Sequence, residues 1–150
     1  MSTKKIEKLV KNFMPLEDGE TIVEAIRGDA YNTSSNIVAR LVGLAAGIIA
    51  KVTGSKSTVT LVVTEKRIIH ITSTKMFWFF DGSITASTFA PRSVNSTGYA
   101  LRRSMIFFKS HYLDLLTSAD GVMIRSTDGK DKVYRMIEAL TNLQDRVKTS

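Results

Sequence analysis

The sequence contains no cysteine, two prolines, one tryptophan and two histidines. Without cysteine, neither a disulfide nor a thiolate metal site can form. The longest apolar run is Leu41–Ala50, about half of the roughly 20 residues that a membrane-spanning helix needs. The first residues contain no apolar segment followed by a small-residue cleavage site, so we predict no secretory signal and expect a cytoplasmic protein.

Motifs that carry chemistry are also missing. His70 and His111 lie far apart in the sequence, and no carboxylate cluster accompanies either one. No serine lies in a Gly-x-Ser-x-Gly elbow, and neither a phosphate-binding loop nor a dinucleotide fingerprint is found. We therefore predict a protein that is not an enzyme, with no cofactor and no metal.

The composition is that of a single globular domain over residues 1–150, with 43% hydrophobic and 23% charged residues. The net charge of +7 favours anionic partners, either nucleic acid or acidic lipid, without choosing between them. The basic residues are dispersed along the chain and no aromatic residues interleave them, which disfavours nucleic-acid binding.

The clearest structural signal is Ser57–Ser73. Val59, Leu61 and Val63 alternate with threonines, a period of two that predicts a strand with one buried face. The alternation resumes at Ile69 after the short charged connection Thr64–Arg67. The stretch therefore predicts a β-hairpin.

Other strands are predicted on both sides of this hairpin. Asp81–Gly82 is typical of a turn, Pro91 ends a strand, and Ser93–Ser104 is polar and gives no clear strand pattern. The aromatic residues of Met76–Phe80 leave two alternatives, a strand covered on both faces or one with an exposed pair. The predicted strands are Thr21–Ala30, Ile84–Phe89, Met105–Lys109, His111–Leu116 and Val122–Arg125, with a turn at Ala119–Gly121 before the last.

Amphipathic helices are predicted at both ends of the chain. In residues 1–15, the apolar residues from Ile6 to Met14 fall on one helix face and lysines on the other, which favours packing over membrane adsorption. In residues 128–148, Asp128 is the predicted cap. There Val133, Met136, Ile137, Leu140 and Val147 share the apolar face, which Leu143 flanks.

A third helix is predicted at residues 36–53. Its small residues recur on one face and would allow another backbone to approach closely. This helix could pack tightly on its own sheet, mediate self-association, or insert shallowly into a membrane. The candidate interface residues are Ala39, Gly43, Ala46, Gly47 and Ala50.

Two segments resemble a known family. Leu61–Ile71, LVVTEKRIIHI, is similar to the Thr-(Asp/Glu)-Lys-Arg hairpin of bacterial pleckstrin-homology-like (PH-like) domains. Glu17–Val23 resembles the start of the first strand of that family, and the likeness covers roughly Leu16–Leu143. The resemblance implies an α+β fold, a bent antiparallel barrel or sandwich of about seven strands closed by a C-terminal helix. The N-terminal helix and the helix inserted between strands one and two are departures from the family.

The resemblance also implies a binding or scaffolding module. We expect protein–protein contacts, with self-association to a homo-oligomer through the inserted helix. The alternative is a peripheral membrane protein, since lipid-binding relatives hold phosphoinositide head groups with basic residues between their first two strands. The candidate anionic-lipid contacts are Lys4, Lys8, Lys11, Arg40, Lys51 and Lys56.

Arg67 has two interpretations. At the hairpin turn it could bind an anionic ligand, or it could satisfy carbonyl groups or a carboxylate such as Glu65 or Asp81. The resemblance favours the structural role.

Overall fold

The structure is a computed structural model that describes residues 3–32, 56–76, 80–104, 108–118 and 121–149. The predicted helix at 36–53, with its candidate interface, and the aromatic residues 77–79 lie outside these ranges. The elements are α1 (Thr3–Phe13), β1 (Ile22–Asn32), β2 (Lys56–Thr64), β3 (Ile68–Met76), β4 (Phe80–Phe89), the short 3-10 helix η1 (Pro91–Ser93), β5 (Val94–Ser104), β6 (Phe108–Thr117), β7 (Gly121–Ser126) and α3 (Lys130–Thr149).

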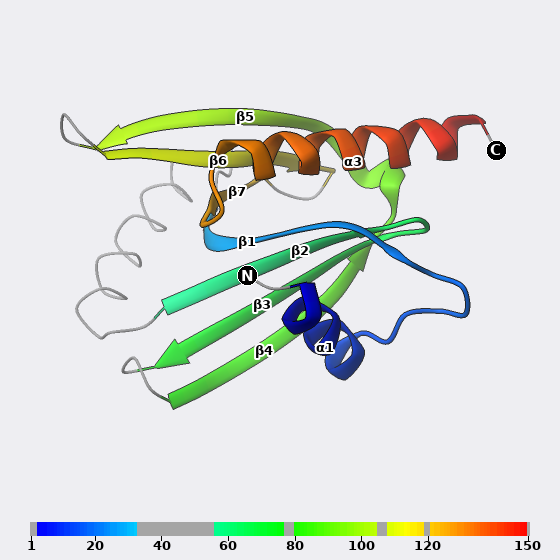
Figure 1. The fold of residues 1–150 in the computed structure, drawn as a ribbon, viewed down its shortest axis with the longest axis horizontal. Coiled ribbons are helices and arrows are strands. Elements are labelled where there is room, and N and C mark those ends of the chain that lie inside the picture. Colours follow the sequence, from blue (N-terminus) through cyan, green and yellow to red (C-terminus); the bar gives the residue numbers. More distant parts are fainter. Residues whose placement is uncertain (1–2, 33–55, 77–79, 105–107, 119–120, 150) are drawn as a thin grey trace.

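The seven strands form one antiparallel sheet in the order β4-β3-β2-β1-β7-β6-β5. The central strand β1 joins the series β2–β4 to the series β5–β7. In Figure 1, β2, β3 and β4 run obliquely below β5 and β6, so the two ends of the sheet differ in direction. The predicted α+β class, with seven strands and a helix at each end of the chain, is confirmed.

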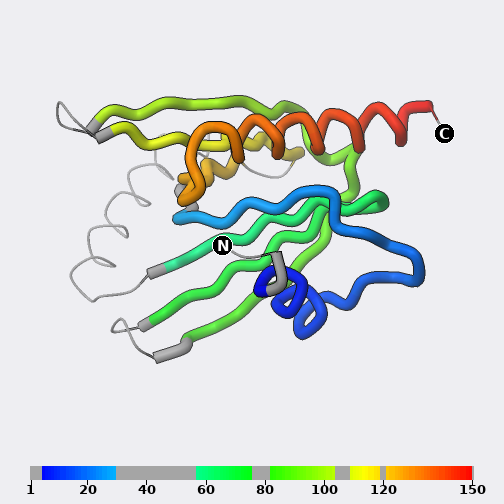
Figure 2. The backbone as a smooth tube through the Cα atoms, in the orientation of Figure 1, coloured from blue at the N-terminus to red at the C-terminus, as the bar shows by residue number. Residues whose placement is uncertain are grey.

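Two helices cover opposite faces of this sheet. On one face, α3 packs Val133, Met136 and Leu140 into a core that includes Leu61 and Leu113. On the other face, the short helix α1 packs against β1, β2 and β3, and in Figure 2 the chain leaves α1 through an outer turn and returns as β1. The core residues of this second face are Ile6, Val10, Ala25, Val62, Ile69 and Ile71.

The covering by α1 corrects one prediction about the central hairpin. The hairpin itself is confirmed, with Val63 opposite Ile68 in the β2–β3 ladder. However, all residues from Val59 to Thr64 are buried, so β2 has two covered faces and not one. Leu61 packs in the core beneath α3, whereas its neighbour Val62 packs beneath α1.

Two further predictions about the strands were wrong. Asp81 and Gly82 lie within β4 and not in a turn, because the β3–β4 register pairs Asp81 with Lys75. The polar segment from Val94 to Ser104 forms a full strand, β5, that pairs with β6 along its length. Pairing with a neighbouring strand decided the structure of this segment, and local propensity did not.

Helix α3 begins at Lys130, two residues after the predicted cap Asp128, and Gly129 before it has a φ of +86°. The predicted apolar face is confirmed for Val133, Met136 and Leu140. Leu143, expected beside that face, lies within the buried core.

Candidate functional site

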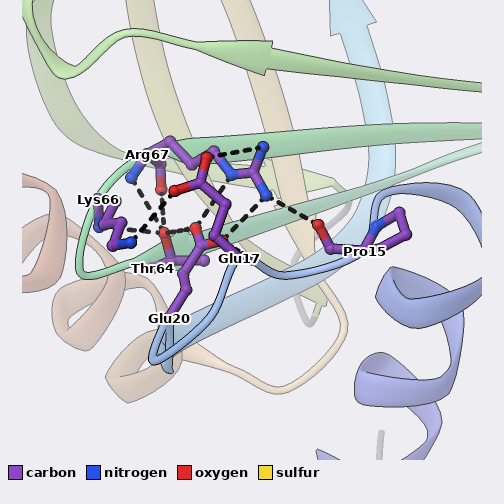
Figure 3. Close-up of polar contacts among 6 residues, drawn as sticks. All are labelled: Pro15, Glu17, Glu20, Thr64, Lys66 and Arg67. Carbon is purple, nitrogen blue, oxygen red and sulfur yellow. Dashed lines mark hydrogen bonds and ion pairs between the residues drawn. The ribbon is translucent and has the colours of Figure 1, made fainter.

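The charged motif Thr64–Arg67 forms the turn between β2 and β3, beside the loop that leads from α1 into β1 (Figure 3). The Thr64 backbone N–H donates to the Arg67 carbonyl at 3.0 Å. Thr64 Oγ1 accepts hydrogen bonds from the backbone N–H groups of Lys66 (3.2 Å) and Arg67 (3.0 Å). Thr64 is fully buried, and its hydroxyl lies 2.6 Å from Glu20 Oε1. The threonine therefore holds the turn closed and also joins it to the neighbouring loop.

Arg67 is engaged by the fold itself. Its Nε donates to Glu20 Oε1 at 3.0 Å, and one terminal nitrogen donates to Glu20 Oε2 at 2.9 Å and to the Pro15 carbonyl at 2.9 Å (Figure 3). This two-pronged pairing with a carboxylate is the geometry for which guanidinium groups are suited. The structural role of Arg67 is confirmed, but the expected partners Glu65 and Asp81 were wrong, because the loop before β1 brings Glu20 to the turn.

The Glu20 carboxyl is ionised in a buried position. Burial by itself would raise its pKa, but hydrogen bonds from Arg67, from Thr64 and from the Glu17 backbone N–H outweigh burial and lower the pKa to about 2. The hydrogen bond with Glu20 also raises the pKa of Arg67, so the pair is charged over the whole ordinary pH range.

This pKa makes folding stability depend on pH. Between pH 4.5 and 2, the unfolded Glu20 carboxyl binds a proton and the folded one does not, so acid favours the unfolded chain. We expect Glu20 to contribute up to about 3 kcal/mol to the free energy of unfolding at pH 7, and to lose this contribution as the pH falls through that interval. Urea unfolding of the wild type and of Glu20→Gln at several pH values measures it. A stability difference between the two proteins that stays constant with pH would contradict the prediction.

A second ionised carboxylate ties α3 to the sheet. Glu24 on β1 accepts from Lys132 Nζ at 2.5 Å and from Arg135 Nε at 3.1 Å. Its Oε1 also accepts the Ala25 backbone N–H at 2.8 Å. Burial opposes ionisation, but these partners lower the pKa of Glu24. Glu24 therefore fixes the first turns of α3 on β1.

An aromatic cluster connects the β5–β6 hairpin with α3. The Tyr99 ring stacks on Tyr134 with a centroid distance of 5.1 Å and on His111 at 5.9 Å. The Tyr99 hydroxyl lies 2.7 Å from His111 Nδ1, and Lys130 Nζ lies 5.1 Å from the Tyr134 ring centroid. Nothing in the sequence pointed to this cluster, since it depends on the β5–β6 register that the polar sequence of β5 concealed.

The comparisons with known proteins give no relative: no family model, curated protein or solved structure matches this chain.

The predicted lipid-contact residues are only partly brought together. Lys8 and Lys11 are exposed on α1, and Lys4 belongs to the same helix. Lys56 is the first residue of β2, while Arg40 and Lys51 lie outside the described residues. The apolar stripe of α1 is used in packing, since Ile6 and Val10 are buried against the sheet. Within the described ranges, no helix is long and apolar enough to cross a membrane.

The histidines occupy separate environments. His70 on β3 packs against the Phe89 ring at 5.6 Å, and burial lowers its pKa. Among the residues that the structure describes, no group of three or more His, Cys, Asp or Glu residues could hold a metal ion.

A cavity of about 40 Å³ lies between α3 and the ends of β1 and β2. It is lined by Val23, Thr64, Ala139, Asn142, Leu143 and Arg146.

Proposed function

We propose that this protein is a non-catalytic PH-like binding and scaffolding module that acts through protein–protein contacts. The observation that carries the proposal is the order of the elements. Seven antiparallel strands follow one another along the chain, and the helix after them packs into the core of the sheet. This is the order that the resemblance of Leu61–Ile71 and Glu17–Val23 predicts.

The ion pairs formed by Glu20 and Glu24 within the domain support the same proposal. The motif residues Thr64 and Arg67 are bound to Glu20, and Glu24 is bound to α3. These pairs join neighbouring elements of the domain, which is what a rigid scaffold requires. We infer that the binding surface lies elsewhere, and we propose residues 37–52 as the surface through which the protein self-associates.

Sedimentation velocity on the wild type and on Gly43→Leu/Gly47→Leu tests this proposal. The wild type should associate as concentration rises, and the double variant should show a lower average mass because leucine prevents close approach of two backbones. Glu138→Leu/Asn142→Leu is the matched control, with two exposed positions four residues apart on α3. The same mass for the wild type and Gly43→Leu/Gly47→Leu would overturn self-association through this segment.

A further inference from the structure

The two edge strands of the sheet are protected to different degrees. An edge strand offers unpaired N–H and C=O groups to any other strand, and proteins protect it with charges, proline or a covering element. On β5, Arg102 and Arg103 are exposed near one end. At the other end of β5, Gln144 of α3 donates to the Val94 carbonyl at 2.6 Å. Both ends of the β5 edge are therefore unfavourable for pairing.

The β4 edge has its one charged residue, Asp81, near its start, and the residues that the structure describes show no further protection of this strand. From Gly82 to Phe89 it contains neither a charged residue nor a proline, although the chain carries 21 basic and 14 acidic residues. Its ladder with β3 is regular from Ile84 to Phe89, and the one irregularity lies before Ile84. Isoleucine, threonine and phenylalanine favour strands, and uncharged segments of this kind pair readily with others. Within the described ranges, β3 is the one strand that pairs with β4.

We propose that β4 pairs with β4 of a second copy of this chain, antiparallel and centred on Ala86. Opposite residues in a continuous sheet must point to the same face, which restricts the possible registers. This register places Ala86 opposite Ala86, Thr85 opposite Ser87, and Ile84 opposite Thr88. All of these residues lie in the regular part of the ladder.

A second copy is the partner that the charges favour. Identical residues approach each other across a two-fold axis, so a charged edge would face its own charge there. In a chain of net charge +7, the neutral β4 edge is a surface where two copies meet without this repulsion. Because β5 is protected, strand pairing ends at two copies and does not extend into a fibre. The inference rests on the proposed function in requiring self-association, but it uses a different surface from residues 37–52.

Lysine substitutions on the two edges test the pairing by sedimentation velocity. Thr85→Lys on β4 should weaken the β4-mediated dimer at least about tenfold, because an edge lysine must be desolvated for pairing. Ser96→Lys on β5 is the matched control, since both hydroxyl residues are exposed on edge strands, and it should behave as the wild type. Combining each lysine change with Gly43→Leu/Gly47→Leu distinguishes the β4 edge from the surface at residues 37–52. The Gly43→Leu/Gly47→Leu protein should still form the β4-mediated dimer, and adding Thr85→Lys should convert that dimer to a monomer.

Cross-linking tests the register, since the chain has no cysteine of its own. Under mild oxidation, Ala86→Cys should form a covalent dimer, because residues opposite each other across two strands lie near disulfide distance. Ala100→Cys, which replaces a half-buried alanine on β5, should not form a covalent dimer.

Equal cross-linking of the two cysteine variants, or association of Thr85→Lys equal to that of the wild type, would overturn the β4 interface. If Gly43→Leu/Gly47→Leu then still lowered the mass, the proposed function would stand without it. A wild type that stays monomeric at high concentration would overturn both.

Discussion

Replacing Arg67 with alanine is expected to lower the free energy of unfolding by about 3–5 kcal/mol, because it leaves a buried carboxylate without its counter-charge. The Glu20 side chain has no exposed area, and the Arg67 guanidinium supplies a hydrogen bond to each of its oxygens. The same substitution removes the donor to the Pro15 carbonyl, which joins the turn to the end of α1. The shift in the midpoint of urea unfolding measures the loss.

Lys66→Ala is the matched control in the same turn. Lys66 Nζ lies 3.1 Å from Glu17 Oε2, but these side chains are 49% and 57% exposed, so the loss should be less than about 1 kcal/mol. The double variant Glu20→Gln/Arg67→Ala should be more stable than Arg67→Ala, because a neutral amide replaces the unpaired charge. Equal losses for Arg67→Ala and Lys66→Ala would show that the buried pair contributes no more than an exposed one.

The strands of the central hairpin were predictable because β-branched residues and a period of two favour strands on both sides of the Thr64–Arg67 turn. What the alternation could not show is that Val62 and Ile71 lie beneath a second helix, since coverage of a face depends on segments far away in the sequence. The segment Val94–Ser104 was missed for the same reason, because its strand structure comes from pairing with β6. Asp81–Gly82 has favourable turn chemistry, but the β3–β4 register places it inside a strand. Local sequence thus predicted elements, and pairing partners decided their extent.

Of the site at the β2–β3 turn, the sequence predicted the turn residues but not the carboxylate that binds them. The Thr64–Arg67 motif was identified, and a structural role for Arg67 was favoured. Its partner Glu20 lies 47 residues earlier, and a carboxylate at that distance has no spacing signal that relates it to the turn. The Tyr99–His111 contact likewise requires the strand register before the two residues can be connected.

The junction between the two halves of the sheet depends on a glycine. Gly28 on β1 pairs with Ser126 on β7, in the ladder that joins β1–β4 to β5–β7. A Cβ atom built on Gly28 would lie 1.7 Å from the Arg125 carbonyl oxygen. Because that oxygen belongs to the backbone of the partner strand, no side-chain rotation can relieve the contact.

Gly28→Ala is therefore expected to lower the free energy of unfolding by more than about 3 kcal/mol, beyond the cost of ordinary overpacking. To admit the methyl group, β1 and β7 would have to move apart. This movement would also separate the series β1–β4 from the series β5–β7, which share the core beneath α3. Gly98→Ala on β5 is the control, because a Cβ there would meet its nearest neighbour, Asp114 Cβ, at 3.8 Å, an ordinary contact. That substitution should be neutral or stabilise the protein by up to about 1 kcal/mol. Thermal and urea unfolding of both variants measure the difference, and a Gly28→Ala protein as stable as Gly98→Ala would show that the β1–β7 junction can open to admit a side chain.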